Sequence, residues 1–155
     1  MGHLSNMAHS YVLAGVTAGM HVRVASPEVY APRADIVTDA ERIGRETGGS
    51  ITLFTDVAEA ARGADVIVTD TWVSMGKEDE KAQRLRDLGG YKVTSAVMVQ
   101  ADPAAIFIHC LPADRGYEVD PEVIDGSQSV IWDEAENRLH AQKALLVWLL
   151  RQQGN

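Results

Sequence analysis

The sequence has one cysteine, few aromatic residues and no long apolar segment. Because Cys110 is the only cysteine, the chain cannot form an internal disulfide, and nothing indicates an oxidising compartment. No apolar run approaches the roughly 20 residues that a membrane-spanning helix needs, and the N-terminus lacks a basic segment followed by an apolar signal core. We therefore expect a soluble, cytoplasmic protein with no membrane partner.

Basic residues are also scarce: 14 Lys and Arg stand against 22 Asp and Glu, giving a formal net charge of −8 at pH 7. Such a field repels nucleic acid, so no nucleic-acid partner is expected, and an anionic ligand would need a local basic pocket. The sequence has no Gly-x-Gly-x-x-Gly or Walker-type loop, and its five histidines do not have metal-ligand spacing. We expect neither a metal nor a cofactor.

What the sequence does contain is enough apolar material for one domain. Hydrophobic residues make up 46% of the 155, so residues 1–155 are expected to form a single domain with a substantial core. Internal repeats and low-complexity tracts are missing, which excludes array architectures.

Segments with strand and helix character alternate along the chain. The predicted strands are 21–26, 50–56, 64–70, 105–110 and 129–133, of which 105–110 is apolar enough to be buried on both faces. The predicted helices are 6–20, 36–47, 57–62, 78–88 and 136–153. This order predicts an α/β fold: a doubly wound, Rossmann-like parallel sheet with helices on both faces. Because such a sheet opens with a central strand and this chain opens with a helix, we expect the first strand to be missing from a truncated chain.

The ligand crevice of an open parallel sheet lies beyond the carboxyl ends of its strands. Two polar segments follow predicted strands there, DTWVSMG at 70–76 and HCLP at 109–112. The Asp70 carboxylate could hold an ammonium group or cap the following turn, and spacing alone leaves both open. Cys110 could be a reactive thiol, although a small buried hydrophobe is the commoner role. His109 points away from Cys110 along a strand, so we expect it to be structural.

Two further polar residues stand near the starts of predicted helices. Asn6 could be no more than an N-cap. Arg138 falls in the first turn of the predicted last helix, where a cation opposes the helix dipole, so it either binds an anion or forms a surface salt bridge. The apolar residues 145–150 of that helix are interpreted as core or interdomain packing.

Four segments, in order and in spacing, resemble the ornithine carbamoyltransferase family: NMAHS (6–10), DTWVSMG (70–76), HCLP (109–112) and DEAENR (133–138). The resemblance runs from about residue 6 to residue 151 and implies the C-terminal, ornithine-binding domain of the aspartate/ornithine carbamoyltransferase family. The family's N-terminal domain has a Ser-x-Arg-Thr-Arg loop and a His-Pro-x-Gln segment. Neither occurs here, so we expect that carbamoyl phosphate domain to be absent.

The resemblance also assigns roles to residues at matching positions. The ornithine site that it implies consists of Asn6, Asp70, Ser74 and Met75. The carbamoyl phosphate site that it implies consists of Cys110, Leu111 and Arg138. Asp70 and Cys110 are the implied catalytic residues, with Asp70 holding the α-ammonium group and Cys110 positioning the reacting amine. Pro112 matches a family proline that is preceded by a cis peptide bond.

The implied reaction is attack by the neutral δ-amine of L-ornithine on the carbonyl carbon of carbamoyl phosphate. It gives citrulline and phosphate, a step of arginine biosynthesis, and intact family members are homotrimers. The expectation for this chain is a half that binds ornithine and is inactive alone. Two alternatives remain open: a carbamoyltransferase for another amine, and a non-catalytic amino-acid-binding fragment or regulatory module.

Overall fold

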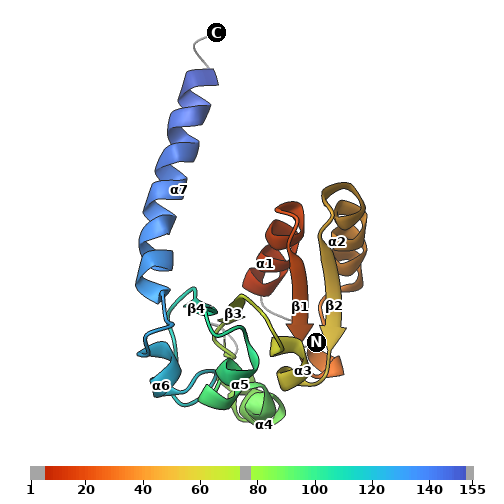
Figure 1. The fold of residues 1–155 in the computed structure, drawn as a ribbon, viewed down its shortest axis with the longest axis vertical. Coiled ribbons are helices and arrows are strands. Elements are labelled where there is room, and N and C mark those ends of the chain that lie inside the picture. The colour runs from red at the N-terminus through yellow and green to blue at the C-terminus, as the bar shows by residue number, and fades with distance from the viewer. Residues whose placement is uncertain (1–5, 74–77, 153–155) are drawn as a thin grey trace.

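The computed structural model describes residues 6–73 and 78–152, and it has an α/β architecture (Figure 1). The helices are α1 (Asn6–Thr17), α2 (Ala34–Thr47), α3 (Val57–Ala61), α4 (Lys81–Leu88), α5 (Ser95–Gln100), α6 (Pro121–Ile124) and α7 (Ile131–Gln152). The strands are β1 (His21–Ala25), β2 (Ser50–Phe54), β3 (Val66–Thr69) and β4 (Ile106–His109). Four predicted strands and all five predicted helices are thus confirmed, most with trimmed or shifted ends.

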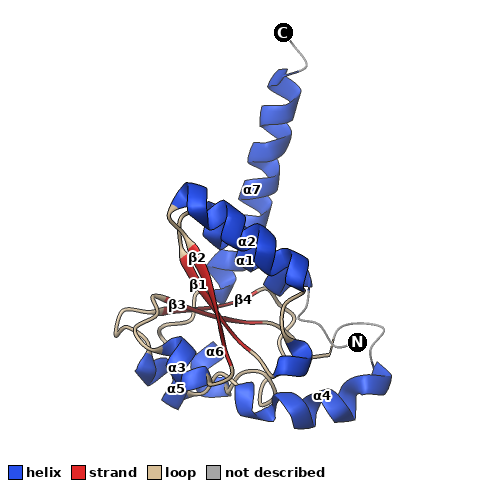
Figure 2. Ribbon diagram, turned by 90° about the vertical axis from the view of Figure 1, so that its right-hand side faces the viewer, coloured by secondary structure: helices blue, strands red, loops and turns tan. Residues whose placement is uncertain are grey.

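The strands form two parallel pairs rather than the one continuous sheet that the sequence predicts. β1 pairs with β2, and β3 pairs with β4. Within the described residues β1 and β3 are not hydrogen-bonded to each other, and the two pairs run in clearly different directions in Figure 2. The parallel α/β character is therefore confirmed, while the described strands do not join into a single sheet.

The first pair has its own small core, beneath α1 and α2. Val12 and Val16 of α1 and Ala40 of α2 are buried there against partly buried residues of both strands. The Gly48–Gly49 turn makes this packing possible. Gly48 ends α2 in the left-handed region at φ 81°, and a Cβ on Gly49 would lie 2.7 Å from the carbonyl oxygen of Val16.

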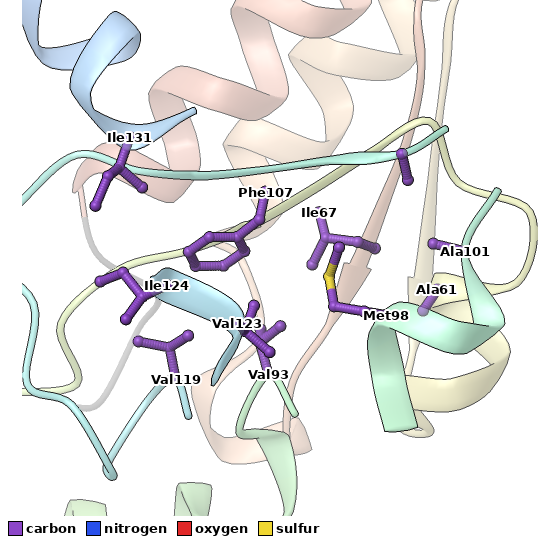
Figure 3. Packing of buried hydrophobic residues seen from close by; sticks show 11 residues of the cluster. Ala61, Ile67, Val93, Met98, Ala101, Phe107, Val119, Val123, Ile124 and Ile131 are labelled. Atoms are coloured by element: carbon purple, nitrogen blue, oxygen red, sulfur yellow. The ribbon is translucent and has the colours of Figure 1, made fainter. Parts of the chain in front are cut away.

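The second pair packs into a larger core centred on Phe107 of β4, whose side chain is fully buried (Figure 3). The other buried members of this core are Ala61, Ile67, Val93, Met98, Ala101, Ala105, Val119, Val123, Ile124 and Ile131. They come from β3, β4, α3, α5, α6 and the start of α7 and from connecting loops. This core therefore fixes the strand ends where the candidate site was predicted.

Two strand predictions need correction. The segment 129–133 is not a strand, since only Ser129 forms a bridge, to Phe107, and α7 begins at Ile131. The segment starts a helix instead of a strand, and Asp133 and Glu134 stabilise the positive end of the helix dipole. The segment 105–110 is not buried on both faces either. Phe107 and His109 are fully buried on one face, whereas Ile106 on the other is 37% exposed.

Helix α7 projects away from the rest of the molecule (Figure 1). Its residues 135–152 are all exposed. The exposed large apolar side chains of this helix are Trp132, Leu139, Leu145, Leu146, Val147, Trp148, Leu149 and Leu150. Core packing of 145–150 is therefore wrong for this structure. Among the described residues, no helix is long and apolar enough to cross a membrane.

Candidate functional site

Asp70 and Cys110 meet at the carboxyl ends of β3 and β4. The register of this parallel pair sets Thr69 opposite His109, so the next residue of each strand comes to the same edge. The Cys110 thiol donates a hydrogen bond to Asp70 Oδ1 at 3.1 Å. The same oxygen accepts the backbone N–H of Thr71 at 2.8 Å, so Asp70 fixes the following turn as well. The predicted meeting of these two segments at one edge is confirmed.

The surroundings of Cys110 keep its thiol protonated. Burial is the largest cause that raises the pKa of Cys110, and together with the hydrogen bond to Asp70 and the charges of Asp70 and Glu134 it raises that pKa from 9.0 to about 12. A thiol with so high a pKa holds almost no thiolate near neutral pH and is a poor nucleophile. Cys110 is therefore suited to donating a hydrogen bond rather than to nucleophilic attack, and its positioning of the amine stays a prediction.

His109 has the structural role that the sequence favoured. Its Nδ1 accepts the backbone N–H of Leu111 at 2.9 Å, which leaves Nε2 as the donor to Glu118 Oε1 at 3.3 Å. Both side chains are almost completely buried. Glu118 Oε1 also accepts the backbone N–H of Asp114 at 2.6 Å. His109 and Glu118 thus hold the loop after β4 at two points. The sequence spacing of Glu118 gave no indication of this role.

The loop after β4 has an unusual backbone. Leu111 has a positive φ of 54°, and its bond to Pro112 is cis, as predicted for Pro112. A leucine in the left-handed region is strained and persists only where neighbouring contacts hold it. The hydrogen bond from Leu111 N–H to buried His109 is such a contact. The loop that presents Cys110 and Leu111 is therefore held in place from within the core.

The remaining predicted site residues are more scattered. Asn6 is the exposed first residue of α1. Arg138 is exposed on α7, seven residues after Ile131, so the expected first-turn conflict with the helix dipole does not exist. Ser74 and Met75 lie outside the described residues. The structure thus joins Asp70 and Cys110 directly and leaves the other assignments as predictions.

A family model described as "Aspartate/ornithine carbamoyltransferase, Asp/Orn binding domain" matches residues 1–149. The chain belongs to this family. It is 70% identical over 148 residues to the ornithine carbamoyltransferase of Clavibacter sepedonicus, covering 96% of this chain and 48% of that protein. The chain thus spans about half the length of the curated relatives that it matches.

Solved structures of carbamoyltransferases agree with the fold. The ornithine carbamoyltransferase from Pyrococcus furiosus matches with a TM-score of 0.85 at 47% identity, over 90% of this chain and 44% of that one. The anabolic enzyme from Campylobacter jejuni matches with a TM-score of 0.91 at 38% identity, over 97% of this chain and 50% of that one. The described elements therefore have the arrangement of a carbamoyltransferase domain.

This carbamoyltransferase domain holds the loop after β3 with a residue that the sequence reasoning missed. Arg84 of α4 donates to the carbonyl oxygen of Trp72 at 3.3 Å and to Glu80 at 2.9 Å. Its side chain is only 12% exposed and its guanidinium lies 5.4 Å from the centre of the Tyr30 ring. One arginine in a charged helix gives no sequence signal for this role, because Lys81 and Arg86 are basic residues of the same helix.

One pocket along the described residues of the carbamoyltransferase domain lies away from these strand ends. It has a volume of about 480 Å³ between α5 and α6 and includes none of the candidate site residues. The site assignment rests instead on the strand ends, where ligands of parallel sheets bind. Among the described residues, no three His, Cys, Asp or Glu side chains are grouped as metal ligands would be.

The high pKa of Cys110 leads to a testable expectation. At pH 8 we expect iodoacetamide to alkylate Cys110 about a hundredfold or more slowly than a free thiol, since the thiolate fraction falls as the pKa rises. Asp70→Asn should speed the reaction by removing the carboxylate, whereas Asp39→Asn on the surface of α2 should not. Mass spectrometry follows the reaction at the sole cysteine. Equal rates in the wild type and Asp70→Asn would contradict the Asp70–Cys110 contact.

Proposed function

We propose that this chain is the ornithine-binding half of an ornithine carbamoyltransferase, the enzyme that makes citrulline and phosphate from L-ornithine and carbamoyl phosphate. The observation that carries the proposal is the Asp70–Cys110 hydrogen bond at the carboxyl ends of two parallel strands, in a chain 70% identical to an enzyme of that name. The identity to an ornithine carbamoyltransferase favours ornithine over another amine as the substrate. The whole enzyme's activity would need the half that this chain does not span.

Asp70 is the proposed partner of the α-ammonium group of ornithine. A carboxylate that already accepts a thiol and a backbone N–H is held in one orientation before the substrate arrives, which lowers the entropic cost of binding. Asn6, Ser74 and Met75 are proposed to complete the ornithine site. This half of the proposal concerns binding alone, so it can be tested on the chain itself.

Cys110 and Leu111 are proposed to face the reacting atoms. The neutral δ-amine forms a bond to the carbonyl carbon, the bond between that carbon and the phosphate oxygen breaks, and the amine proton passes to the departing phosphate. Hydrogen-bond donors and cations stabilise the charge that develops on the carbonyl oxygen and on the leaving phosphate. The neutral thiol of Cys110, which donates to Asp70 in this structure, can donate one such hydrogen bond once the ornithine ammonium group takes its place at Asp70. Arg138 is proposed to pair with the phosphate. No covalent intermediate is required.

Arg138→Ala is expected to separate the two halves of the proposed site. Inorganic phosphate should bind the variant about tenfold or more weakly, because a charge-assisted hydrogen bond is lost. Ornithine affinity should stay within about twofold, since Arg138 lies on α7, whereas Asp70 follows β3. Titration calorimetry measures both affinities. Unchanged phosphate binding in Arg138→Ala would remove Arg138 from the site.

The deciding experiment measures ornithine binding by calorimetry and citrulline formation on the same purified chain. The proposal expects ornithine to bind and no citrulline to form from carbamoyl phosphate. Turnover by the chain alone would mean that a phosphate site is built without the other half. A chain that binds no ornithine and makes no citrulline would favour the non-catalytic alternative.

The arrangement of the complete sheet, the cellular location and the oligomeric state are also proposals. We infer that the two parallel pairs belong to one doubly wound arrangement, with room for a strand between β1 and β3, which the described residues leave unpaired with each other. A cytoplasmic location is supported by the single cysteine, and the homotrimer of intact family members stays a prediction.

A further inference from the structure

One hydrogen bond connects the first helix to the last one. The hydroxyl of Tyr11 on α1 donates to Glu134 Oε1 on α7 at 2.5 Å, although 123 residues separate the two in the sequence. Both groups are partly buried. The two helices belong to the two different cores, so this contact joins the halves of the domain close to the strand ends.

Glu134 also belongs to the polar cluster around Cys110. Asp70 and Glu134 are the carboxylates that raise the pKa of the Cys110 thiol, and Glu134 also accepts the hydroxyl of Tyr11. Asp70 follows β3, Glu134 lies in α7 and Tyr11 lies in α1. Burial raises the pKa of Tyr11, and its hydrogen bond to Glu134 raises it further. The second carboxylate oxygen of Glu134 is buried and has no hydrogen-bond partner within the described part of the chain. Glu134 therefore remains available to a group entering the site.

The position of Glu134 in α7 connects this cluster to Arg138. Residues four apart in an α-helix lie on the same face, one turn from each other, so Arg138 follows Glu134 directly along that face. Beyond its buried first residue, Ile131, the helix has few contacts to hold it, and residues 135–152 are exposed. The hydrogen bond from Tyr11 to Glu134 therefore holds the beginning of α7 against α1.

We propose that Tyr11 and Glu134 are positioning residues of the carbamoyl transfer site, in which Tyr11 holds the Glu134 carboxylate beside Cys110 and fixes the turn of α7 that leads to Arg138. This inference rests on the proposed function, because the positions of Glu134 and Arg138 matter to the reaction only if the site transfers a carbamoyl group. Its structural part, the placement of Glu134 beside the thiol, can be measured without any substrate.

The substrate-free test is the pH profile of Cys110 alkylation by iodoacetamide. Glu134→Gln keeps an oxygen that accepts the Tyr11 hydroxyl but removes the charge, so the midpoint should fall by about half a pH unit. Tyr11→Phe keeps the charge but releases the carboxylate, and the midpoint should fall by a similar amount. Tyr30→Phe is the matched control, since Tyr30 also donates to a carboxylate, that of Asp87, at 2.9 Å. It should keep the wild-type midpoint.

A role of Tyr11 in packing alone would leave the midpoint of Tyr11→Phe at the wild-type value, and that result would overturn the proposal. An unchanged midpoint in Glu134→Gln would also overturn the proposal. This second variant keeps the test decisive if the Tyr11 variant fails to fold. Circular dichroism identifies such a failure before the midpoints are compared.

The link to Arg138 is tested with inorganic phosphate as the probe. Tyr11→Phe should reproduce the weakened phosphate binding of Arg138→Ala, while Glu134→Gln should stay within about twofold of the wild type because its hydrogen bond to Tyr11 survives. Equal phosphate behaviour in the wild type and Tyr11→Phe would contradict the link. Failure of the wild-type chain to bind ornithine would contradict the proposed function instead, and the alkylation midpoints would still decide the placement of Glu134.

Discussion

Asp70→Ala is expected to abolish measurable ornithine binding. The carboxylate is half-buried, is oriented by two hydrogen bonds and is the proposed partner of the ornithine α-ammonium group. Truncating one partner of such a charge pair costs on the order of 2–5 kcal/mol, which corresponds to a loss of affinity of about thirtyfold or more. Titration calorimetry with L-ornithine measures the change directly.

The matched control for Asp70→Ala is Asp39→Ala, which removes the same charge from the exposed surface of α2. It should bind ornithine as the wild type does. Affinity that is the same in Asp70→Ala and in the wild type would show that the substrate lies elsewhere. Asp70→Asn separates charge from shape, because its amide oxygen can still accept the Thr71 N–H while the attraction to an ammonium group is gone.

Phe107→Ala is expected to have the largest effect on stability. Phe107 is fully buried at the centre of the larger core and contributes to β4, which carries the candidate site (Figure 3). Replacing a buried phenylalanine with alanine costs about 3–5 kcal/mol, a large fraction of the stability of an ordinary domain. Urea unfolding followed by circular dichroism should show a lower midpoint, or a chain that is already unfolded.

Val99→Ala provides the comparison, because Val99 is 79% exposed on α5, close to the same core. Its free energy of unfolding should stay within about 0.5 kcal/mol of the wild type. A Phe107→Ala variant with wild-type stability would mean that the core is loosely packed at its centre and cannot fix the strand ends.

The strands and long helices were predictable because their signals are local. The β-branched runs at β1 and β3 and the amphipathic pattern of α2 need no knowledge of the rest of the chain. The short helices α5 and α6 were missed, whereas the equally short α3 was predicted, because four to six residues give only a weak periodic signal. The predicted strand at 129–133 failed because Ile131 and Trp132 have strand character but are followed by residues that continue a helix.

The candidate site was predictable only as far as strand ends define it. The meeting of Asp70 and Cys110 follows from two parallel neighbours in register, a rule that applies to any such sheet. The contributions of Glu118, Arg84 and Tyr11 depend on which loops and helices fold back over the strands. That information lies in tertiary packing, so no spacing between residues in the sequence contains it.

The exposed part of α7 can unfold locally while the two cores stay folded. Residues 135–152 of α7 are exposed, and helices in proteins are stabilised mostly by packing, so we expect these turns to unfold more easily than the two cores. Melting of residues 135–152 removes little buried surface and leaves both cores intact. The free energy of unfolding of the two cores therefore does not describe the outer turns of α7. Any surface that covers the apolar side chains of α7 gains from burying them, offset by the entropy of ordering the helix.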